Sequence, residues 1–309
     1  MLAARDLRLR ELLRSYGSCL IAYSGGVDSV FLAHVAHREL GDRALAVIAD
    51  SPSLARRELR EALELGVQFG FPVRVVNTAE FQNDQYLANP NNRCYFCKHA
   101  LFTELAPLAR AGGFAVIAYG ENSSDVGDHR PGAVAAAEFA VRAPRKEAGL
   151  TKADIRALSA QLGLPTADKP QLACLSSRIP TGEAVTPAKL RMIEEAEYFL
   201  RDRGFHDVRV RHHEIGGGGA VGSGPASGHL ARIEVGPTEL IRLVAGDLPQ
   251  QLTEYCRGLG YAHVTLDLAG YRRGSTNGVS GALMLTAGIA EIPLKRAATA
   301  RAHAQLGAG

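Results

Sequence analysis

The first half of the chain alternates short apolar runs with longer segments of helical periodicity. The apolar runs, each of which we interpret as a strand, cover residues 19–23, 44–50, 73–77 and 115–120. The segments of helical periodicity cover residues 30–36, 54–70 and 101–111. Strands separated by helices predict a parallel sheet with helices on both faces. We therefore expect a doubly wound α/β domain that binds its ligands at the carboxyl ends of the strands, near residues 24–29, 50–53 and 120–122.

The alternation breaks over residues 168–187, where prolines surround a Cys-Leu-Ser-Ser-Arg run and indicate an irregular loop. A smaller α+β pattern follows this loop. Its expected helices cover residues 187–203 and 238–245 and a segment ending at 259, and its expected strands cover 208–211, 233–235 and 264–267. We place a domain boundary near residue 183, which divides the chain into domains 1–183 and 184–309.

Composition and charge give no indication of a nucleic-acid-binding, membrane-spanning or disulfide-rich protein. The chain has 309 residues, enough for two domains, and its formal charge of +3 is too small to indicate a nucleic-acid partner by itself. No apolar run approaches the ~20 residues that span a bilayer, and the N-terminus lacks the apolar core of a signal peptide. Five cysteines, an odd number, fit a reducing compartment better than a disulfide framework. We expect a cytoplasmic protein.

The segment Ser24-Gly25-Gly26-Val27-Asp28-Ser29 stands where the first strand meets the first helix. Glycines at a helix N-terminus let an anion approach backbone N–H groups closely. Ser24 and Ser29 add hydroxyl donors, whereas Asp28 would repel a bare phosphate and so suggests a bridging magnesium ion. The lysine that ends a Walker P-loop is missing. The segment predicts a phosphate-holding loop of another type, and the alternative is an ordinary turn with a serine cap.

Three cysteines lie in polar segments and two in apolar ones. Cys94 and Cys97 form a C-x-x-C that could be a redox pair, half of a zinc site or two ligands of an iron–sulfur cluster. The sequence has neither a second zinc-binding pair nor a thioredoxin-like context. Cys174 precedes an arginine that could favour a nucleophilic thiolate, and the alternative is an inert buried thiol. We assign Cys19 and Cys256 to the core.

Together these features resemble the LarE family, the ATP-dependent sulfur transferases of nickel-pincer cofactor biosynthesis. The matching segments are SGGVDS (24–29), NRCYFCKHALF (92–102), GENSSDVGDHRPG (120–132), LTKADIRALSAQLGLPTADKPQLACLSSRIPTG (150–182), VRVRHH (208–213), ARIEVGPTEL (231–240) and VTLDLAGYRRGSTN (264–277). The resemblance spans nearly the whole chain. SGGVDS alone is shared with NAD, GMP and asparagine synthetases and with tRNA-thiolating enzymes, but the segment around Cys174 and GYRRGSTN are not generic.

The resemblance implies the fold of the PP-loop ATP pyrophosphatases (adenine nucleotide alpha hydrolase-like) and a role in maturation of lactate racemase. ATP would adenylate a carboxylate of pyridinium-3,5-biscarboxylic acid mononucleotide, a small-molecule substrate. Pyrophosphate would leave onto residues 24–29 and Mg²⁺, which Asp28 helps to hold. Sulfur would then displace AMP and leave a thiocarboxylate. Ser51 and Gly120, at the ends of two further strands, complete the expected nucleotide site.

The resemblance offers two sulfur sources. In one branch of the family, the cysteine matching Cys174 gives up its own sulfur and becomes dehydroalanine. In another, three cysteines hold a [4Fe-4S] cluster that carries an extra sulfide. Because Cys94 and Cys97 accompany Cys174 here, the resemblance favours the cluster, with these three cysteines as its ligands. The supplier of the sulfide is not apparent from the sequence.

The resemblance also indicates a site for the substrate phosphate. Arg209 and Arg211 alternate on a predicted strand and therefore share a face, from which they could grip a phosphate. Glu197 and Glu234 would hold a divalent cation or orient these arginines. The alternatives are a solvated strand face and surface ion pairs. Tyr95 corresponds to an aromatic residue near the bound nucleotide or substrate, although it could be a packing ring.

Two further segments each have two possible interpretations. Arg272 and Arg273 could serve an anion or an oligomer contact, and we expect a homo-oligomer by analogy with the family. Residues 216–228 contain a formal G-x-G-x-x-G, but Pro225 and more glycine follow where a helix should begin, so we reject a dinucleotide site. This segment exceeds the short turn expected there and is a flexible loop or a lid.

Three other functions compete with sulfur transfer. A PP-loop amide synthetase would need an ammonia source, and no glutaminase domain is visible in the sequence. A tRNA thiolase predicts a broad basic surface, which the charge of +3 does not support. A non-catalytic ATP-binding regulatory module predicts no pyrophosphate release and tolerance of Cys174→Ala. We rank all three below sulfur transfer.

Overall fold

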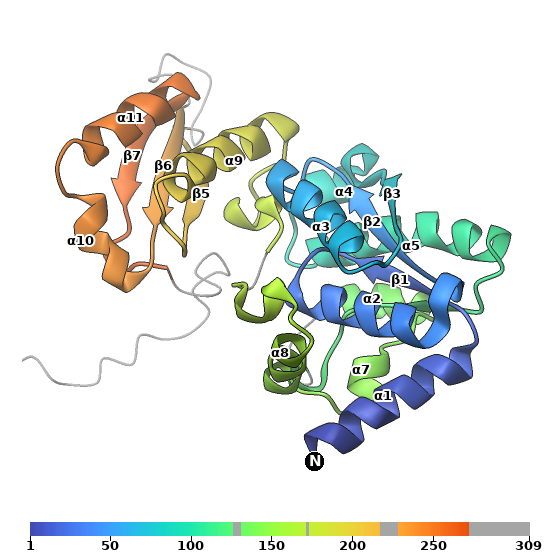
Figure 1. The fold of residues 1–309 in the computed structure, drawn as a ribbon. Coiled ribbons are helices and arrows are strands. Elements are labelled where there is room, and N and C mark those ends of the chain that lie inside the picture. The colour runs from blue at the N-terminus through green and yellow to red at the C-terminus, as the bar shows by residue number, and fades with distance from the viewer. Residues whose placement is uncertain (126–130, 171–172, 217–227, 272–309) are drawn as a thin grey trace, which may run out of the picture. The chain divides into compact units, whose positions relative to one another are not determined.

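Four parallel strands form the larger of two sheets in the computed structural model, which describes residues 1–125, 131–170, 173–216 and 228–271 (Figure 1). The strands are β1 (Cys19–Tyr23), β2 (Ala44–Asp50), β3 (Val73–Asn77) and β4 (Val116–Ala118), in the order β3-β2-β1-β4. The chain moves outward from β1 to β3 and then crosses to β4 on the other side of β1. This reversal beside β1 is where doubly wound sheets bind ligands, and residues 24–29 follow β1 directly.

Helices cover both faces of this sheet, as predicted. One face packs on α1 (Leu2–Tyr16), α2 (Val27–Leu40), α3 (Arg56–Gln68) and α8 (Lys152–Gln161), and the other packs on α5 (Arg93–Ala111) and α6 (Pro131–Glu138). Successive side chains of β1 point to opposite faces of the sheet. Cys19 and Ile21 pack in the hydrophobic cluster on the face covered by α2, and Leu20 and Ala22 pack in the cluster on the face covered by α5. A strand buried on both faces reads as one continuous apolar run.

Several helices differ from the prediction. Helix α5 begins at Arg93 and not near residue 101, so the C-x-x-C lies in its first turns. The short helices α4 (Asp84–Leu87) and α7 (Pro144–Glu147), together with α6 and α8, were not predicted. The start of α8 could have been predicted from the sequence. The side chains of Thr151 and Asp154 each accept a hydrogen bond from the other residue's backbone N–H. This is the capping box that a T-x-x-D pattern indicates.

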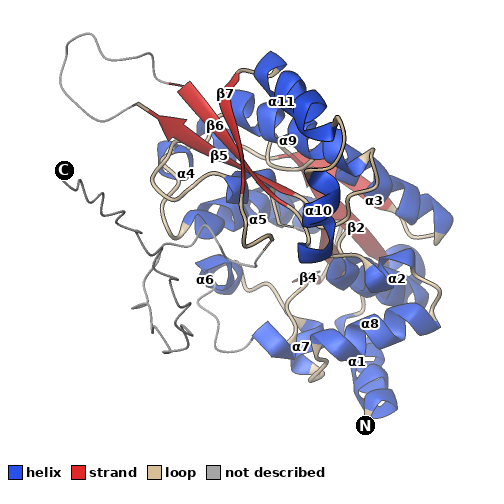
Figure 2. Ribbon diagram, turned by 90° about the vertical axis from the view of Figure 1, so that its left-hand side faces the viewer, coloured by secondary structure: helices blue, strands red, loops and turns tan. Residues whose placement is uncertain are grey.

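The smaller sheet has three strands (Figure 2): β5 (Arg209–Ile215), β6 (Gly228–Glu234) and β7 (Tyr261–Leu266). Strand β6 pairs antiparallel with β5 and parallel with β7. Helices α9 (Pro187–Arg201), α10 (Leu240–Leu243) and α11 (Leu248–Gly258) supply side chains to the hydrophobic cluster on one face, where Val210 and Ile233 meet Leu200 and Leu252. Arg209 and Arg211 alternate with Val210 and therefore belong to the opposite face.

Residues 1–277 form one compact unit that contains both sheets. A further cluster of buried side chains, including Tyr86, Leu175 and Ile193, combines residues from before and after position 183. The domain boundary at that position stays a prediction. Residues 217–227, Arg272 and Arg273 lie outside the described residues. None of the described helices combines the length and the apolar character needed to cross a membrane.

Candidate functional site

The phosphate-holding loop connects β1 to α2 and is closed by its two serines. The Oγ of Ser29 accepts a hydrogen bond from the backbone N–H of Ser24 at 3.1 Å and lies 3.1 Å from the Ser24 hydroxyl. The Ser29 hydroxyl also donates to the carbonyl of Gly26, which is the N-cap of α2. The loop therefore directs the N-terminus of α2, with its partial positive charge, toward the ends of the strands.

Gly25 is required by both conformation and space. Its φ is +71°, in the left-handed region that favours glycine, and a Cβ there would lie 2.8 Å from the Cβ of Ala62 on α3. The loop can pack this tightly against α3 only because position 25 has no side chain.

Asp28, in the first turn of α2, is surrounded by donors. Its carboxylate forms ion pairs with Lys152 and with Arg145, whose Nη1 lies 3.1 Å from Oδ1, and accepts a hydrogen bond of 3.4 Å from Asn122. Arg145 is completely buried and also donates to the Asp28 carbonyl at 2.5 Å. A Cβ at Gly120 would lie 2.9 Å from Nη2 of Arg145. The predicted site residue Gly120 therefore makes room for the cation that holds Asp28.

The loop that carries Cys174 docks at the end of β2, next to the phosphate-holding loop. The hydroxyls of Ser53, Tyr86 and Ser176 form a buried triangle with distances of 2.5, 2.7 and 2.9 Å. The backbone N–H of Leu175 also donates to the Ser53 carbonyl at 2.9 Å. Ser51 is buried beside them, and its hydroxyl accepts from the N–H of Ser53. Residues about 120 positions apart are thus held together at one edge of the sheet.

The three candidate cysteines interact electrostatically. Burial, with a smaller contribution from Cys174, raises the pKa of the Cys97 thiol to about 12. Partial loss of hydration likewise raises the pKa of the Cys94 thiol, and Cys174 contributes to this shift. Arg93, which donates to the Ser176 carbonyl at 2.9 Å, interacts with all three thiols. Within the described parts of the chain, no three His, Cys, Asp or Glu side chains form a group that could hold a metal ion, so cluster ligation stays a prediction.

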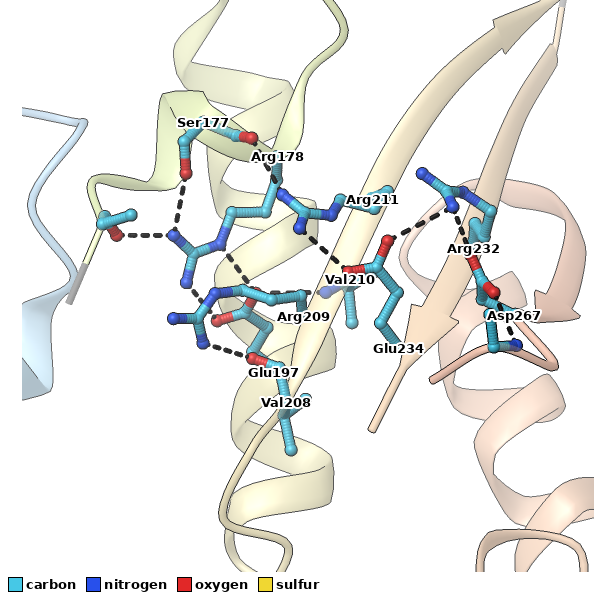
Figure 3. Close-up of polar contacts among 12 residues, drawn as sticks. Ser177, Arg178, Glu197, Val208, Arg209, Val210, Arg211, Arg232, Glu234 and Asp267 are labelled. Carbon is cyan, nitrogen blue, oxygen red and sulfur yellow. Dashed lines mark hydrogen bonds and ion pairs between the residues drawn. The ribbon is translucent and has the colours of Figure 1, made fainter. Parts of the chain in front are cut away.

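Arg178 links the Cys174 loop to the smaller sheet (Figure 3). Its guanidinium donates to the carbonyls of Ala173 and Cys174, at 2.5 and 3.0 Å, and to both carboxylate oxygens of Glu197, at 2.8 and 2.9 Å. Glu197 also accepts from the N–H of Val210 in β5 at 3.1 Å. Burial by itself would raise the pKa of Glu197, but Arg178, together with Arg209 and Arg201, holds the pKa below its usual value.

Arg209 and Arg211 lie on the same face of β5, as predicted, and both are buried. Arg211 donates to the Ser177 carbonyl at 3.1 Å and to Glu234 at 2.9 Å (Figure 3). The guanidinium of Arg209 lies 4.8 Å from the ring centre of Tyr271. Its pKa is lowered by burial and by the neighbouring charge of Arg178. The alternative of a solvated strand face therefore does not describe these two side chains.

The arginines and carboxylates drawn in Figure 3 form a connected network. Arg178 pairs with Glu197, Arg211 pairs with Glu234, and Arg232 pairs with Glu234 and Asp267. Both predicted glutamates are buried, and their expected roles, holding a divalent cation or orienting Arg209 and Arg211, stay predictions. Buried guanidinium groups suit an anion with several oxygens, such as a phosphate.

Tyr95 lies on α5, and its contacts involve α5 and α6. Its hydroxyl donates to the Glu138 carboxylate at 3.0 Å, and its ring centre lies 5.3 Å from that of Phe96 and 5.8 Å from that of His99. These contacts leave its expected role near the nucleotide or substrate untested.

Several residues of this region were missed by the sequence analysis. Arg145 and Lys152 pair with Asp28, and Tyr86 helps to hold the Cys174 loop. Lys152 could have been noticed, because it follows the helix cap Thr151 and lies in one of the matching segments. Nothing in the sequence marks Arg145, because only the fold brings it to Asp28.

Comparison with known proteins gives three informative matches. The chain is 41% identical over 279 residues to an uncharacterized protein of Synechocystis sp., covering 90% of this chain and 99% of that protein. It is 31% identical over 278 residues to the pyridinium-3,5-bisthiocarboxylic acid mononucleotide synthase of Lactiplantibacillus plantarum, covering 89% and 95%. A shorter match, 35% over 72 residues, joins 23% of this chain to 14% of a glutamine-hydrolyzing GMP synthase of Chlamydia muridarum. No family model matches the chain.

Proposed function

The chain belongs to the LarE family of pyridinium-3,5-bisthiocarboxylic acid mononucleotide synthases, and from that membership we propose that it is an ATP-dependent sulfur transferase acting on the corresponding biscarboxylic acid mononucleotide. A substrate carboxylate oxygen attacks the α-phosphorus of ATP, the bond to the β-phosphate oxygen breaks, and pyrophosphate leaves with the electron pair. A sulfur nucleophile then adds to the acyl carbon. AMP departs, and a thiocarboxylate remains.

The observation that carries this proposal is the convergence of two loops at one edge of the parallel sheet. The loop of residues 24–29 offers the N-terminus of α2 to phosphates, and the Cys174 loop is hydrogen-bonded to the end of β2, the neighbouring strand. Adenylation and sulfur transfer must occur at the same substrate carboxyl group. A nucleotide loop beside a cysteine loop meets that requirement.

Each part of the site has a chemical task in this proposal. Asp28, whose carboxylate is 25% exposed, would share Mg²⁺ with the phosphates and so neutralise part of their charge. Arg209 and Arg211 would hold the phosphate of the substrate mononucleotide, with Glu197 and Glu234 orienting the buried guanidinium groups around it. The mononucleotide would then lie between a fixed anion site and the reacting carboxyl group.

The sulfur would come from Cys174 or through a [4Fe-4S] cluster on Cys94, Cys97 and Cys174. In the first case Cys174 loses hydrogen sulfide in net terms and becomes dehydroalanine, so each chain supplies one sulfur atom. In the second case the three thiolates would hold the cluster, whose open iron takes up sulfide from outside. Cys174 influences the pKa of both Cys94 and Cys97, which fits either source.

The test is incubation of the protein with ATP, Mg²⁺ and the biscarboxylic acid mononucleotide, followed by mass spectrometry of the product and assay of AMP and pyrophosphate. We expect AMP and pyrophosphate in equal amounts and a product in which oxygen is exchanged for sulfur. Release of ADP and phosphate, or formation of less than one thiocarboxylate per chain with and without added sulfide, would contradict the proposal.

Anaerobic purification with iron and acid-labile sulfide analysis distinguishes the two sulfur sources. About four irons per chain, lost in Cys94→Ala, Cys97→Ala and Cys174→Ala, would support the cluster. Iron-free protein after anaerobic reconstitution, together with a turnover-dependent mass loss at Cys174, would support the sacrificial cysteine. Cys256→Ala, a buried cysteine of α11, serves as the control.

A further inference from the structure

A lysine lies at the phosphate-holding loop although the loop itself contains none. Lys152 is the first residue of α8, and its ammonium group pairs with Asp28 in the first turn of α2. The backbone of Lys152 is anchored, because its N–H donates to the Ser124 hydroxyl at 3.1 Å and Thr151 caps the helix. The far end of the side chain is therefore delivered from a rigid base to the N-terminus of α2, where an anion would bind.

The two cations on Asp28 differ in their freedom to move. The side chain of Arg145 is completely buried, bonds to both the carbonyl and the carboxylate of Asp28, and is confined by the backbone of Gly120. The side chain of Lys152 is 28% exposed and rotates about four bonds. Arg145 is consequently a permanent partner of the carboxylate, whereas Lys152 can be replaced.

Charge balance indicates when this replacement would happen. Arg145 and Lys152 place two cations beside the Asp28 carboxylate, and cations at this position attract a polyphosphate before any metal binds. Asp28 would hold Mg²⁺ together with the nucleotide, and its carboxylate would then no longer need Lys152 for neutralisation. The ammonium group of Lys152 would be free to pair with the phosphate oxygens.

We infer that Lys152 is a phosphate-binding residue that substitutes for the missing lysine of a Walker P-loop, an inference that rests on the proposed function. It neutralises Asp28 in the free protein and transfers its charge to the pyrophosphate group of ATP on binding. Pyrophosphate gains negative charge as it leaves, so a cation held at this point stabilises the departure more than it stabilises bound ATP. The ligand class is the polyphosphate of a nucleotide, and pyrophosphate is its minimal form.

The experiment measures binding of inorganic pyrophosphate to the full chain by isothermal titration calorimetry, with and without Mg²⁺. Lys152→Met removes the charge but keeps the length of the side chain, and we expect it to weaken binding about tenfold or more. Lys152→Arg keeps the charge and should bind within about threefold of the wild type. Lys169→Met is the matched control, because Lys169 also pairs with a carboxylate, but with that of Glu61 at 2.8 Å and not with Asp28.

Asp28→Asn separates the proposed role from a purely structural ion pair. In the absence of Mg²⁺, this variant releases Lys152 and removes a repelling charge, so it should bind pyrophosphate more tightly than the wild type. Adding Lys152→Met to it should abolish the gain. A structural role predicts instead that both single variants lower the melting temperature and that neither tightens binding.

The outcomes also separate this inference from the proposed function. If the wild type binds pyrophosphate and Lys152→Met binds it within twofold, the role of Lys152 is overturned while the function of the loop stands. If the wild type binds no pyrophosphate with or without Mg²⁺, both are overturned. Weakened binding in Lys152→Met, with an unchanged melting temperature and recovery in Lys152→Arg, supports the inference.

Discussion

The two charged regions of this protein pair carboxylates with cations in opposite ways. At the phosphate-holding loop, Asp28 is 25% exposed and one of its cations, Lys152, is 28% exposed. On the smaller sheet, Glu197 and Glu234 are 4% and 0% exposed, and their arginine partners Arg178 and Arg211 are 3% and 5% exposed. An exposed pair can exchange partners at little cost, whereas separating a buried pair leaves an uncompensated charge in the interior.

The difference suits two different ligands. A nucleotide must enter with its metal and leave as AMP and pyrophosphate in every cycle, so exchangeable charges are an advantage at the loop. The substrate phosphate does not react, so a rigid and pre-organised group of arginines can hold it throughout. Arg178 connects the two regions, because it bonds to Glu197 and also to the carbonyl of Cys174.

The largest expected effect is that of Cys174→Ala. This residue is exposed, so the variant should fold normally, but thiocarboxylate formation should fall to background because both proposed sulfur routes need the thiol. Adenylation does not use the thiol and should persist. Mass spectrometry of the product and exchange of labelled pyrophosphate into ATP measure the two steps separately. A variant that still forms thiocarboxylate at the wild-type rate would overturn both proposed sulfur routes.

Glu197→Gln should produce the largest loss of stability. The substitution leaves Arg178 buried without its charge partner, and the expected cost is about 3–5 kcal/mol in the free energy of unfolding. Urea unfolding measures this cost. Asp202→Asn is the control, because Asp202 makes a similar two-pronged pair with Arg57 but is 53% exposed, and we expect little change. Equal effects of the two variants would remove the distinction between buried and exposed pairs.

Gly25→Ala should be moderately destabilising and should also weaken ATP binding. The added methyl group would lie 2.8 Å from the Cβ of Ala62 in a backbone with φ of +71°, and we expect a loss of roughly 1–3 kcal/mol. Gly17→Ala has nearly the same φ, +72°, in open space, so it isolates the backbone cost. Calorimetric ATP titrations and urea unfolding of both variants provide the comparison.

The double variant Gly25→Ala/Ala62→Gly tests the steric part of this argument. It removes the methyl group that the new side chain would meet, so stability should recover toward that of Gly17→Ala. A double variant as unstable as the sum of the single ones would show that contact with α3 does not limit position 25.

The smallest expected effect is a pH dependence of stability. Burial would raise the folded-state pKa of Glu197, but Arg178, with Arg209 and Arg201, lowers it below its ordinary value of 4.5. Its contribution to stability is therefore complete above about pH 4.5 and is lost as the pH falls through the folded-state pKa. Urea midpoints measured between pH 7 and pH 3 should fall less steeply for Glu197→Gln than for the wild type. Parallel curves would contradict this assignment.

Much of the parallel sheet could be predicted because its strands are local patterns. Residues 19–23, 44–50 and 73–77 coincide with β1, β2 and β3. The reason is clearest for β1, because a strand covered on both faces is continuously apolar. The segment of residues 24–29 likewise indicated a phosphate-holding turn before a helix. The start of α5 was missed because Arg93 and Cys94 carry no apolar periodicity, and residues 131–161 were left without helices although Thr151 and Asp154 form a capping box.

By itself, the sequence determined the sheet, the loop of residues 24–29, the shared face of Arg209 and Arg211, and the family. Tertiary structure alone brought Arg145 and Lys152 to Asp28, more than a hundred residues away in the chain, and bonded Ser176 to Ser53. The physical reason is that strands and capped helix ends follow from interactions between near neighbours in the sequence. Pairing of distant charges depends on where complete helices pack, and no local pattern encodes that.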